Sequence, residues 1–221
     1  MRTIRVVTAS AALLGLLLPA TTEAQLGRRF ENAWFFGAKA GSGAIWTTTT
    51  RGYAPLIGGE TLITRKRGGL YIAYDQMYLG TFRDADFTTT VPDPVDGERL
   101  VELGEMRRVT AMAMLFPNKR LLWRPYFGVG FAVNMMLNSQ PVGDYVSTTH
   151  EEFVRATIDD QSTRAAPIIM GGLQMELLRF SLFGQASYMP AQTDFLLNGN
   201  ETYFLEFGIR YNIGSSIERI R

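Results

Sequence analysis

The end of the chain alternates strictly between apolar and polar positions. From Thr202 to Ile213, a large apolar side chain occupies every second position, and charged, amide or glycine residues stand between them. The apolar positions are Tyr203, Leu205, Phe207, Ile209, Tyr211 and Ile213. Because successive side chains of a β-strand point to opposite faces, this pattern predicts a strand with a wide apolar face and a narrow polar face.

Seven earlier segments show alternation of the same period. We expect strands at residues 33–46, 56–66, 70–79, 100–116, 121–137, 165–178, 180–189 and 202–213. The sequence of the segment 100–116 does not show which of its faces is apolar. Short turns follow the second, fourth and sixth segments, and longer links are expected at 47–55, 80–99, 138–164 and 190–201. In the third long link, Thr149 and Glu152 have the spacing of a capping box, which favours a short helix there.

The first 24 residues have the features of a secretion signal. Arg2 and Arg5 supply the positive start, residues 11–20 form an apolar core too short to span a bilayer as a helix, and small residues precede Gln25. We therefore expect residues 1–24 to be a signal peptide and residues 25–221 to form one domain. An uncleaved anchor is the alternative, which the absence of a longer apolar run disfavours.

The net charge and the cysteine content limit the classes of protein to which this chain can belong. The formal net charge is only +1, so a nucleic-acid partner is not expected, and there is no cysteine. A secreted chain without disulfides must be stabilised by hydrogen bonds and packing, which a closed barrel provides because every strand edge is paired. After the signal segment no run of eighteen apolar residues occurs, so no transmembrane helix is expected.

The sizes of the side chains on the two faces indicate which face points outward. The apolar face carries many large rings, including Trp123, Phe127 and Phe131, more than an eight-stranded interior could hold. The polar face is rich in small residues that suit a narrow interior: Gly37, Gly41, Gly128, Gly130, Ala132 and Gly208. The expected fold is therefore all-β, an eight-stranded antiparallel up-and-down transmembrane β-barrel. A soluble secreted barrel that binds a ligand inside is the alternative.

Tryptophans mark the expected edges of the apolar band. Trp34 and Trp46 are twelve residues apart, which corresponds to roughly 28 Å along the membrane normal for a strand tilted by about 45°. That height approximates the apolar band of an outer-membrane barrel. We expect Trp34, Trp46 and Trp123 to be interfacial aromatics.

With these features the chain resembles the small outer-membrane barrels of the OmpA-transmembrane, OmpX and OmpW kind. The last strand matches their sorting signal at Glu206, Gly208, Tyr211 and Ile213, although the chain continues beyond Ile213 to Arg221. The resemblance implies a location in the bacterial outer membrane, contact with outer-membrane lipid, and handling by the barrel assembly machinery. It also implies a monomer.

Several charged residues fall on the face that is expected to point inward. They are Lys39, Glu60, Asp75, Arg124, Glu176, Glu206 and Arg210. A buried charge without a partner costs several kcal/mol, so these residues must pair, and Lys39 is the natural partner of Glu206 because the first and last strands adjoin in a closed barrel. The network is expected to plug the lumen, and a narrow polar pore is the alternative.

Other candidate chemistry is weak. The single histidine, His150, lies near Ser147 and Glu151, but neighbours in a loop do not provide the geometry of a catalytic pair, so no enzyme is expected. The acidic link with Asp84, Asp86, Asp93 and Asp96 matches no calcium-loop spacing. Four methionines are expected to face lipid or pack rather than bind metal, and no metal or cofactor is predicted: Met112, Met114, Met135 and Met136.

The functional expectation is accordingly general. A narrow charged lumen with long extracellular loops favours a structural or surface-interaction role. Passive conduction of small or hydrophobic molecules across the outer membrane is the first alternative, and ligand binding by a soluble secreted barrel is the second.

Overall fold

The computed structural model describes residues 32–47, 50–85, 100–118, 123–143, 145, 147–192, 195–197 and 201–215. The expected signal segment lies outside these residues, and so do the side chains of the four aspartates of the acidic link. Within the described part of the chain, no helix is both long enough and apolar enough to cross a bilayer.

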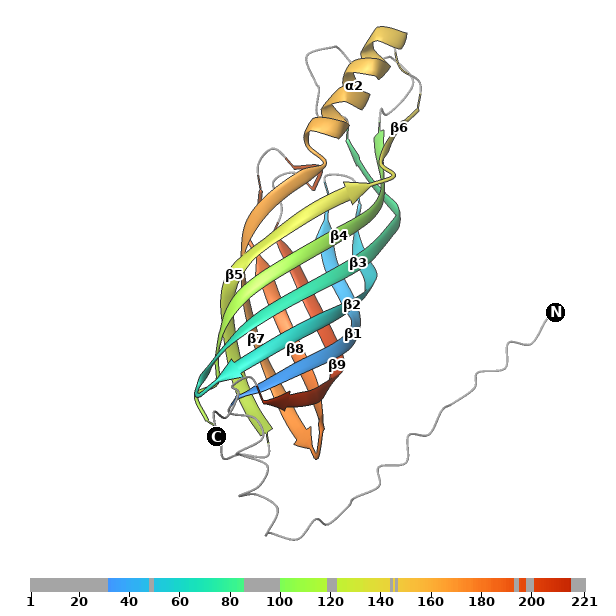
Figure 1. Ribbon diagram of the computed structural model, residues 1–221. Helices are drawn as coiled ribbons and strands as arrows, with labels where there is room; N and C mark the ends of the chain where they lie inside the picture. Colours follow the sequence, from blue (N-terminus) through green and yellow to red (C-terminus); the bar gives the residue numbers. More distant parts are fainter. Residues whose placement is uncertain are drawn as a thin grey trace, which may run out of the picture.

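Eight long antiparallel strands form a closed barrel (Figure 1). They are β1 (Ala33–Trp46), β2 (Arg51–Arg65), β3 (Gly68–Ala85), β4 (Leu100–Leu115), β5 (Trp123–Leu137), β7 (Thr163–Leu177), β8 (Phe180–Met189) and β9 (Thr202–Ser215). Each strand pairs with its neighbours in the chain, and the pairing of β1 with β9 closes the ring. The predicted fold class is confirmed.

Two shorter elements extend the barrel beyond the end that carries the long links. Strand β6 (Gln140–Val142) pairs with the start of β4, and helix α2 (Thr148–Asp160) follows it and projects past the barrel (Figure 1). The helix begins two positions earlier than the capping box predicted. Its N-cap is Ser147, whose hydroxyl accepts a hydrogen bond from the backbone N–H of His150 at 3.2 Å, so Thr149 lies inside the first turn.

The first link is shorter than predicted. Strand β2 begins at Arg51 rather than near residue 56, which leaves residues 47–50 between β1 and β2 instead of residues 47–55. Gly52 and Pro55 are residue types common in loops. The strand nevertheless continues through them, because Pro55 is paired with Ser42 on β1. Tyr53 and Ile57, on either side of Pro55, both face outward. Strand β3 also continues to Ala85, into the predicted second link 80–99, and β7 begins at Thr163, within the predicted third link 138–164. The fourth link agrees with the predicted 190–201.

The inward face of β4 changes along its length because of a bulge. Tyr78 is paired with Glu105, whereas Phe82 is paired with Leu103, so three residues of β3 stand opposite one residue of β4. Gly80 lies in this bulge with a φ of 34°, a conformation that glycine adopts without strain. Leu103 and Met106 are consequently both buried, although they are three positions apart. Inward and outward residues alternate within each half of β4, but the alternation is interrupted between the two halves.

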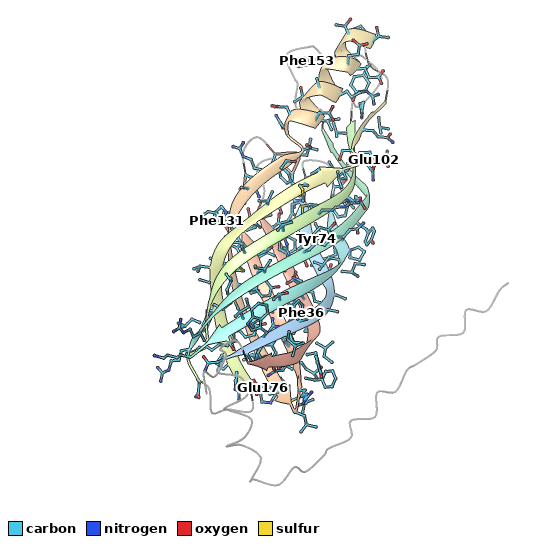
Figure 2. All side chains as sticks on the ribbon, in the orientation of Figure 1. Phe36, Tyr74, Glu102, Phe131, Phe153 and Glu176 are labelled. Carbon is cyan, nitrogen blue, oxygen red and sulfur yellow. The ribbon has the colours of Figure 1, made fainter. Side chains whose placement is uncertain are left out.

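The outward face is apolar, as the ring-size argument predicted, and Figure 2 shows Phe36, Tyr74 and Phe131 on the wall of the barrel. The side chains of Phe127, Phe131 and Phe207 are more than half exposed. The interior is not filled by small residues alone. Glycines leave space for four of the buried aromatic side chains: Phe116 beside Gly69, Tyr126 beside Gly172, Phe183 beside Gly208 and Phe204 beside Gly43.

A glycine at the closing seam of the barrel is required by the backbone that it faces. A Cβ on Gly41 would lie 2.1 Å from the carbonyl oxygen of Leu205 and 2.8 Å from the Cα of Glu206, both on β9. Those atoms cannot move without separating β1 from β9. We therefore expect Gly41→Val to lower the free energy of unfolding by about 3 kcal/mol, measured by urea unfolding in lipid vesicles. The matched control is Ala40→Val, because the side chain of Ala40 is exposed on the outer face of β1, and equal losses in both variants would contradict the assignment.

Candidate functional site

Six charged side chains meet in the middle of the lumen, and each is at most 5% exposed. They come from five strands: β1, β2, β3 and β4 contribute one each, and β9 contributes two. The alternation of each strand directs these side chains inward, opposite the rings that face outward. They are Lys39, Glu60, Asp75, Arg108, Glu206 and Arg210.

Four of these residues form one cluster of ion pairs. The Nζ of Lys39 lies 2.9 Å from Asp75 Oδ1 and 3.1 Å from Glu206 Oε1. The guanidinium of Arg108 donates to Asp75 Oδ2 at 2.7 Å and to Glu206 Oε1 at 2.5 Å. The same guanidinium stacks over the ring of Phe204 at 3.9 Å. Each carboxylate is therefore shared by two cations.

A second cluster is centred on Arg210, which is fully buried. Its Nε donates to Glu60 Oε1, and its Nη1 donates to Gln174 Oε1 at 2.8 Å. Its guanidinium also lies 3.8 Å from the ring centroid of Phe183, so both its donors and its face are occupied.

Tyr71 and Gln185 join the two clusters into one network. The hydroxyl of Tyr71 donates to Glu60 at 2.9 Å and accepts from Lys39 at 3.0 Å and from Gln185 at 3.2 Å. The amide nitrogen of Gln185 also donates to Glu206 Oε2 at 2.5 Å, and its oxygen accepts from Tyr126 at 2.9 Å. A chain of hydrogen bonds thus crosses the interior in several directions.

Two of these contacts span the full width of the barrel. In the strand order, β4 and β9 are four strands apart in either direction, and so are β3 and β8. The bond from Arg108 to Glu206 joins the first pair of opposite walls, and the bond from Gln185 to Tyr71 joins the second. The side chains therefore meet across the axis of the barrel rather than lining a hole.

The network is balanced in charge. With every group ionised, the cations Lys39, Arg108 and Arg210 match three carboxylates. Removing charges from water is costly, and attraction in a dry interior offsets that cost only when each group has well-placed partners. The equal number of cations and carboxylates and their shared contacts meet this condition. The cost of leaving any one group unpaired explains why so many strands contribute side chains to the network.

The seven charges predicted to line the lumen are divided between two places. Lys39, Glu60, Asp75, Glu206 and Arg210 lie in the central network, whereas Arg124 and Glu176 form a separate buried pair nearer the short-turn end of β5 and β7. Sequence reasoning missed four members of the network: Tyr71, Arg108, Gln174 and Gln185. Gln174 and Gln185 lie on the polar faces of their strands, but neutral side chains carry no signal that a partner is required.

The loop-side half of the lumen is apolar. Buried residues above the network include Ile45, Leu79, Leu103, Met106 and Met136. A segment of the last long link, Phe195 to Leu197, is also buried, and the N–H of Leu196 donates to the carbonyl of Gln161 at 3.3 Å. The described segment thus adds three apolar side chains to the core.

The other candidate residues take packing or surface positions. His150 is buried in the first turn of α2, and its ring contacts that of Tyr145 in an edge arrangement, while Ser147 is occupied as the N-cap. Of the predicted methionines, Met112, Met114 and Met136 face inward and pack. Among the described residues, no three acidic, histidine or cysteine side chains are grouped as a metal site would need.

The residues of the predicted sorting signal lie on β9 with the expected alternation. Glu206 points into the lumen, Gly208 lies in the same inward row beside the buried ring of Phe183, and Tyr211 and Ile213 are partly exposed on the outer wall. Of the predicted interfacial aromatics, Trp34 is 39% and Trp123 54% exposed, and Trp46 packs edge-on against Tyr203.

Comparison with known proteins identifies the fold class. No protein-family model matches this chain, and no curated protein matches it. Among solved structures, Neisserial surface protein A superposes with a TM-score of 0.54 at 10% identity, covering 81% of this chain and 97% of that one. The predicted resemblance is thereby confirmed for the fold, which is that of the small eight-stranded outer-membrane barrels.

Two further structures cover similar shares of the chain with lower scores. The N-terminal β-barrel domain of Pseudomonas aeruginosa OprF has a TM-score of 0.47 at 11% identity over 83% of this chain and 98% of that one. The attachment invasion locus protein Ail of Yersinia pestis has a TM-score of 0.46 at 11% identity, covering 83% and 99%.

Proposed function

We propose that this protein is an outer-membrane barrel with a closed lumen, which serves a structural or surface-interaction role through the elements at its long-link end. The observation that carries the proposal is the bond from Arg108 to Glu206, which joins opposite walls of the barrel at 2.5 Å. A hydrated ion cannot pass a lumen whose centre is occupied by paired side chains.

The membrane location rests on the outer wall. Its exposed side chains include aromatic and aliphatic residues on every long strand, as in Phe36, Tyr74 and Phe131. Exposed charges also occur on it, and two of them, Arg83 and Arg107, are paired with the carboxylates of Glu102 and Glu105. In water such a surface would be an aggregation hazard, and in lipid it is the stable arrangement. A soluble barrel that binds a ligand inside is disfavoured because its interior would have to be apolar and open. Handling of the chain by the barrel assembly machinery through β9, and a monomeric state, belong to the same proposal.

The surface role rests on the elements beyond the barrel. Strand β6 and helix α2 extend beyond the rim of the barrel. On the helix, Phe153 is 58% exposed (Figure 2). An i,i+4 ion pair between Arg155 and Glu151, at 2.9 Å, lies on the same exposed helix. Following the convention of these barrels, the long links face the exterior and the short turns face the periplasm.

Planar-bilayer recording tests the closed lumen directly. The purified protein, inserted into a bilayer, is expected to show no stable conductance. The double variant Arg108→Ser/Glu206→Ser removes both ends of the bond across the lumen without leaving a charge unmatched, and it is expected to conduct. Stable channels in the unmodified protein would contradict the proposal and favour the passive conduit, for which the apolar loop-side half of the lumen would provide the entrance.

A further inference from the structure

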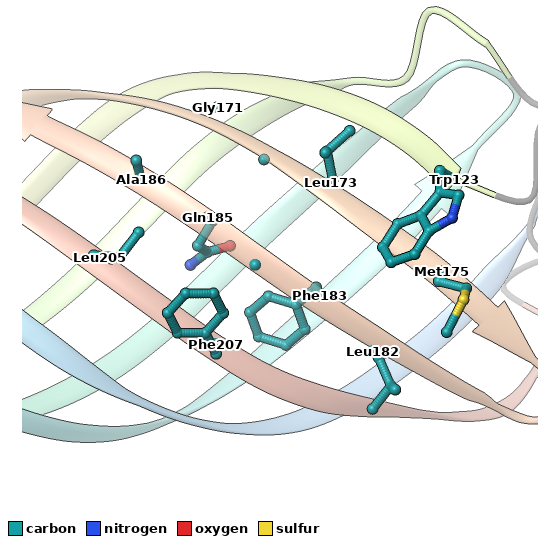
Figure 3. A pocket seen from close by; sticks show the side chains of 12 residues that line it. Trp123, Gly171, Leu173, Met175, Leu182, Phe183, Gln185, Ala186, Leu205 and Phe207 are labelled. Atoms are coloured by element: carbon teal, nitrogen blue, oxygen red, sulfur yellow. The ribbon is translucent and has the colours of Figure 1, made fainter. Parts of the chain in front are cut away.

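An apolar hollow lies in the outer wall of the barrel over β5, β7, β8 and β9 (Figure 3). Its volume is about 510 Å³. The floor consists of small residues, Gly171 on β7 with Gly184 and Ala186 on β8, and larger apolar side chains stand around them. The floor residues belong to the outward-facing rows, and two residues of the inward rows, Phe183 and Gln185, also line the hollow, so it lies directly outside the charged network.

The strand register explains why the wall is hollow here. Gly171 is paired with Ala186 on one side and with Phe127 on the other, and Gly184 is paired with Phe207. At this level β7 and β8 therefore carry small outward residues between two strands that carry rings. A Cβ built on Gly171 would touch only the ring of Phe127, at an ordinary 3.6 Å, so the space above this glycine is open.

One end of the hollow approaches the short-turn end of the barrel. Trp123, Met175 and Leu182 lie at this end in Figure 3, and Ala186 and Leu205 lie at the other. Three residues before Leu182 is Arg179, in the turn between β7 and β8, which is exposed. The guanidinium of Arg179 donates to the hydroxyl of Tyr211 at 3.3 Å. The bond places this cation on the outer surface of β9, four residues nearer the short-turn end than Phe207, which lines the hollow.

The short-turn rim is basic as a whole. The turn between β2 and β3 carries Arg65, Lys66 and Arg67, all exposed, and no carboxylate occurs in the described residues of the three short turns. An apolar hollow that ends at a cation complements a molecule with a hydrocarbon chain and an anionic head. A second copy of the barrel does not fit as well, because two basic rims would be brought together.

We propose that the hollow and Arg179 form a site for one anionic phospholipid of the periplasmic leaflet. An acyl chain lies over Gly171 and Ala186, beside the ring of Phe207 that covers Gly184, and the phosphate contacts the guanidinium of Arg179. The inference rests on the proposed membrane location, with the short turns in the periplasm. A flexible chain can fill the irregular space between Phe127 and Phe207, and Trp123 marks the level at which hydrocarbon gives way to headgroups.

Contact quenching by brominated acyl chains tests the proposal. The three tryptophans of the chain are reduced to one by Trp34→Phe and Trp46→Phe, so that the fluorescence reports Trp123. The protein is reconstituted into phosphatidylcholine vesicles that contain a small fraction of brominated phosphatidylglycerol or, for comparison, brominated phosphatidylcholine. We expect the anionic lipid to be enriched about fivefold at Trp123, the ratio that corresponds to about 1 kcal/mol for one cation near an anionic headgroup.

Two variants and one control isolate the site. Arg179→Gln is expected to abolish the preference for the anionic lipid, and Gly171→Leu is expected to reduce quenching by either lipid because its side chain fills the hollow. Arg65→Gln removes a cation from the same rim at a distant turn and is expected to leave the preference unchanged. Heat-modifiable migration on gels checks that each variant is folded.

The outcomes separate this inference from the proposed function. Equal quenching by the two lipids in the unmodified protein would overturn the site while leaving the membrane location intact, and so would equal loss of preference in Arg65→Gln and Arg179→Gln. Absence of quenching by both lipids, with no binding to vesicles, would overturn the membrane location itself. Lipid-independent energy transfer between labelled copies, abolished by Gly171→Leu, would assign the hollow to a second barrel and also overturn the lipid site.

Discussion

Replacing Arg108 with methionine is expected to lower the free energy of unfolding by about 3–5 kcal/mol, the cost of breaking a buried ion pair by removing one partner. The guanidinium supplies bonds to both Asp75 and Glu206. Without it, two carboxylates remain beside the single ammonium of Lys39, and the lumen carries one uncompensated negative charge. Methionine keeps much of the packing against Phe204, so the loss reports the charge rather than a cavity.

The neighbouring arginine is the matched control. Arg107 is on the opposite face of β4, its side chain is 42% exposed, and its partner is Glu105 at 3.0 Å. Exposed ion pairs contribute about 0–1 kcal/mol, so Arg107→Met is expected to have a small effect. Unfolding of both variants in urea, from lipid vesicles, measures the difference. Similar losses at the two positions would show that water reaches the network and that the lumen is not closed.

Most of the barrel wall could be predicted because an apolar outer face and a narrow interior force strict alternation on the strands. The segments 33–46 and 180–189 have the same ends in the sequence pattern and in the structure. The pattern failed where composition resembled a loop although the strand continued, as at Gly52 and Pro55. Proline is tolerated there because outward-facing and inward-facing positions on both sides of it still match the pairing with β1.

Arg108 could not be assigned because the bulge at Gly80 is a tertiary feature. It changes which residues of β4 face inward, and nothing in the sequence of β4 itself marks the position where Leu103 and Met106 both turn inside. If the alternation ran without interruption along the whole of β4, only one of those two residues would point into the interior. Reading the two halves of β4 separately around Gly104 would have placed Arg108 on the inner face.

The network partners could be predicted only where strand adjacency decides them. Lys39 and Glu206 lie on strands that must adjoin in a closed barrel, and the structure brings their charged atoms to 3.1 Å. The bonds from Arg108 to Glu206 and from Gln185 to Tyr71 cross the whole lumen, so they depend on the barrel diameter and on the relative heights of opposite walls. Neither quantity can be obtained from alternation within one strand.

A double-mutant cycle on Lys39 and Glu206 is expected to show strong coupling. Lys39→Met leaves Asp75 and Glu206 with Arg108 alone, an excess of one negative charge, and should cost about 3–5 kcal/mol. Glu206→Gln leaves Lys39 and Arg108 with Asp75 alone, an excess of one positive charge, and should cost a similar amount. The double variant retains Arg108 opposite Asp75, and the lumen is neutral again.

The loss in the double variant should therefore be smaller than the sum of the two single losses by about 1–3 kcal/mol, the usual range for residues within one ion-pair network. The glutamine at position 206 can still accept a bond from Arg108, and the methionine at position 39 is of similar length to lysine, so packing changes little across the cycle. Urea unfolding in lipid vesicles of the four proteins gives the coupling energy. Strictly additive losses would mean that the two side chains do not interact, and the close contact between β1 and β9 inside the lumen would then be wrong.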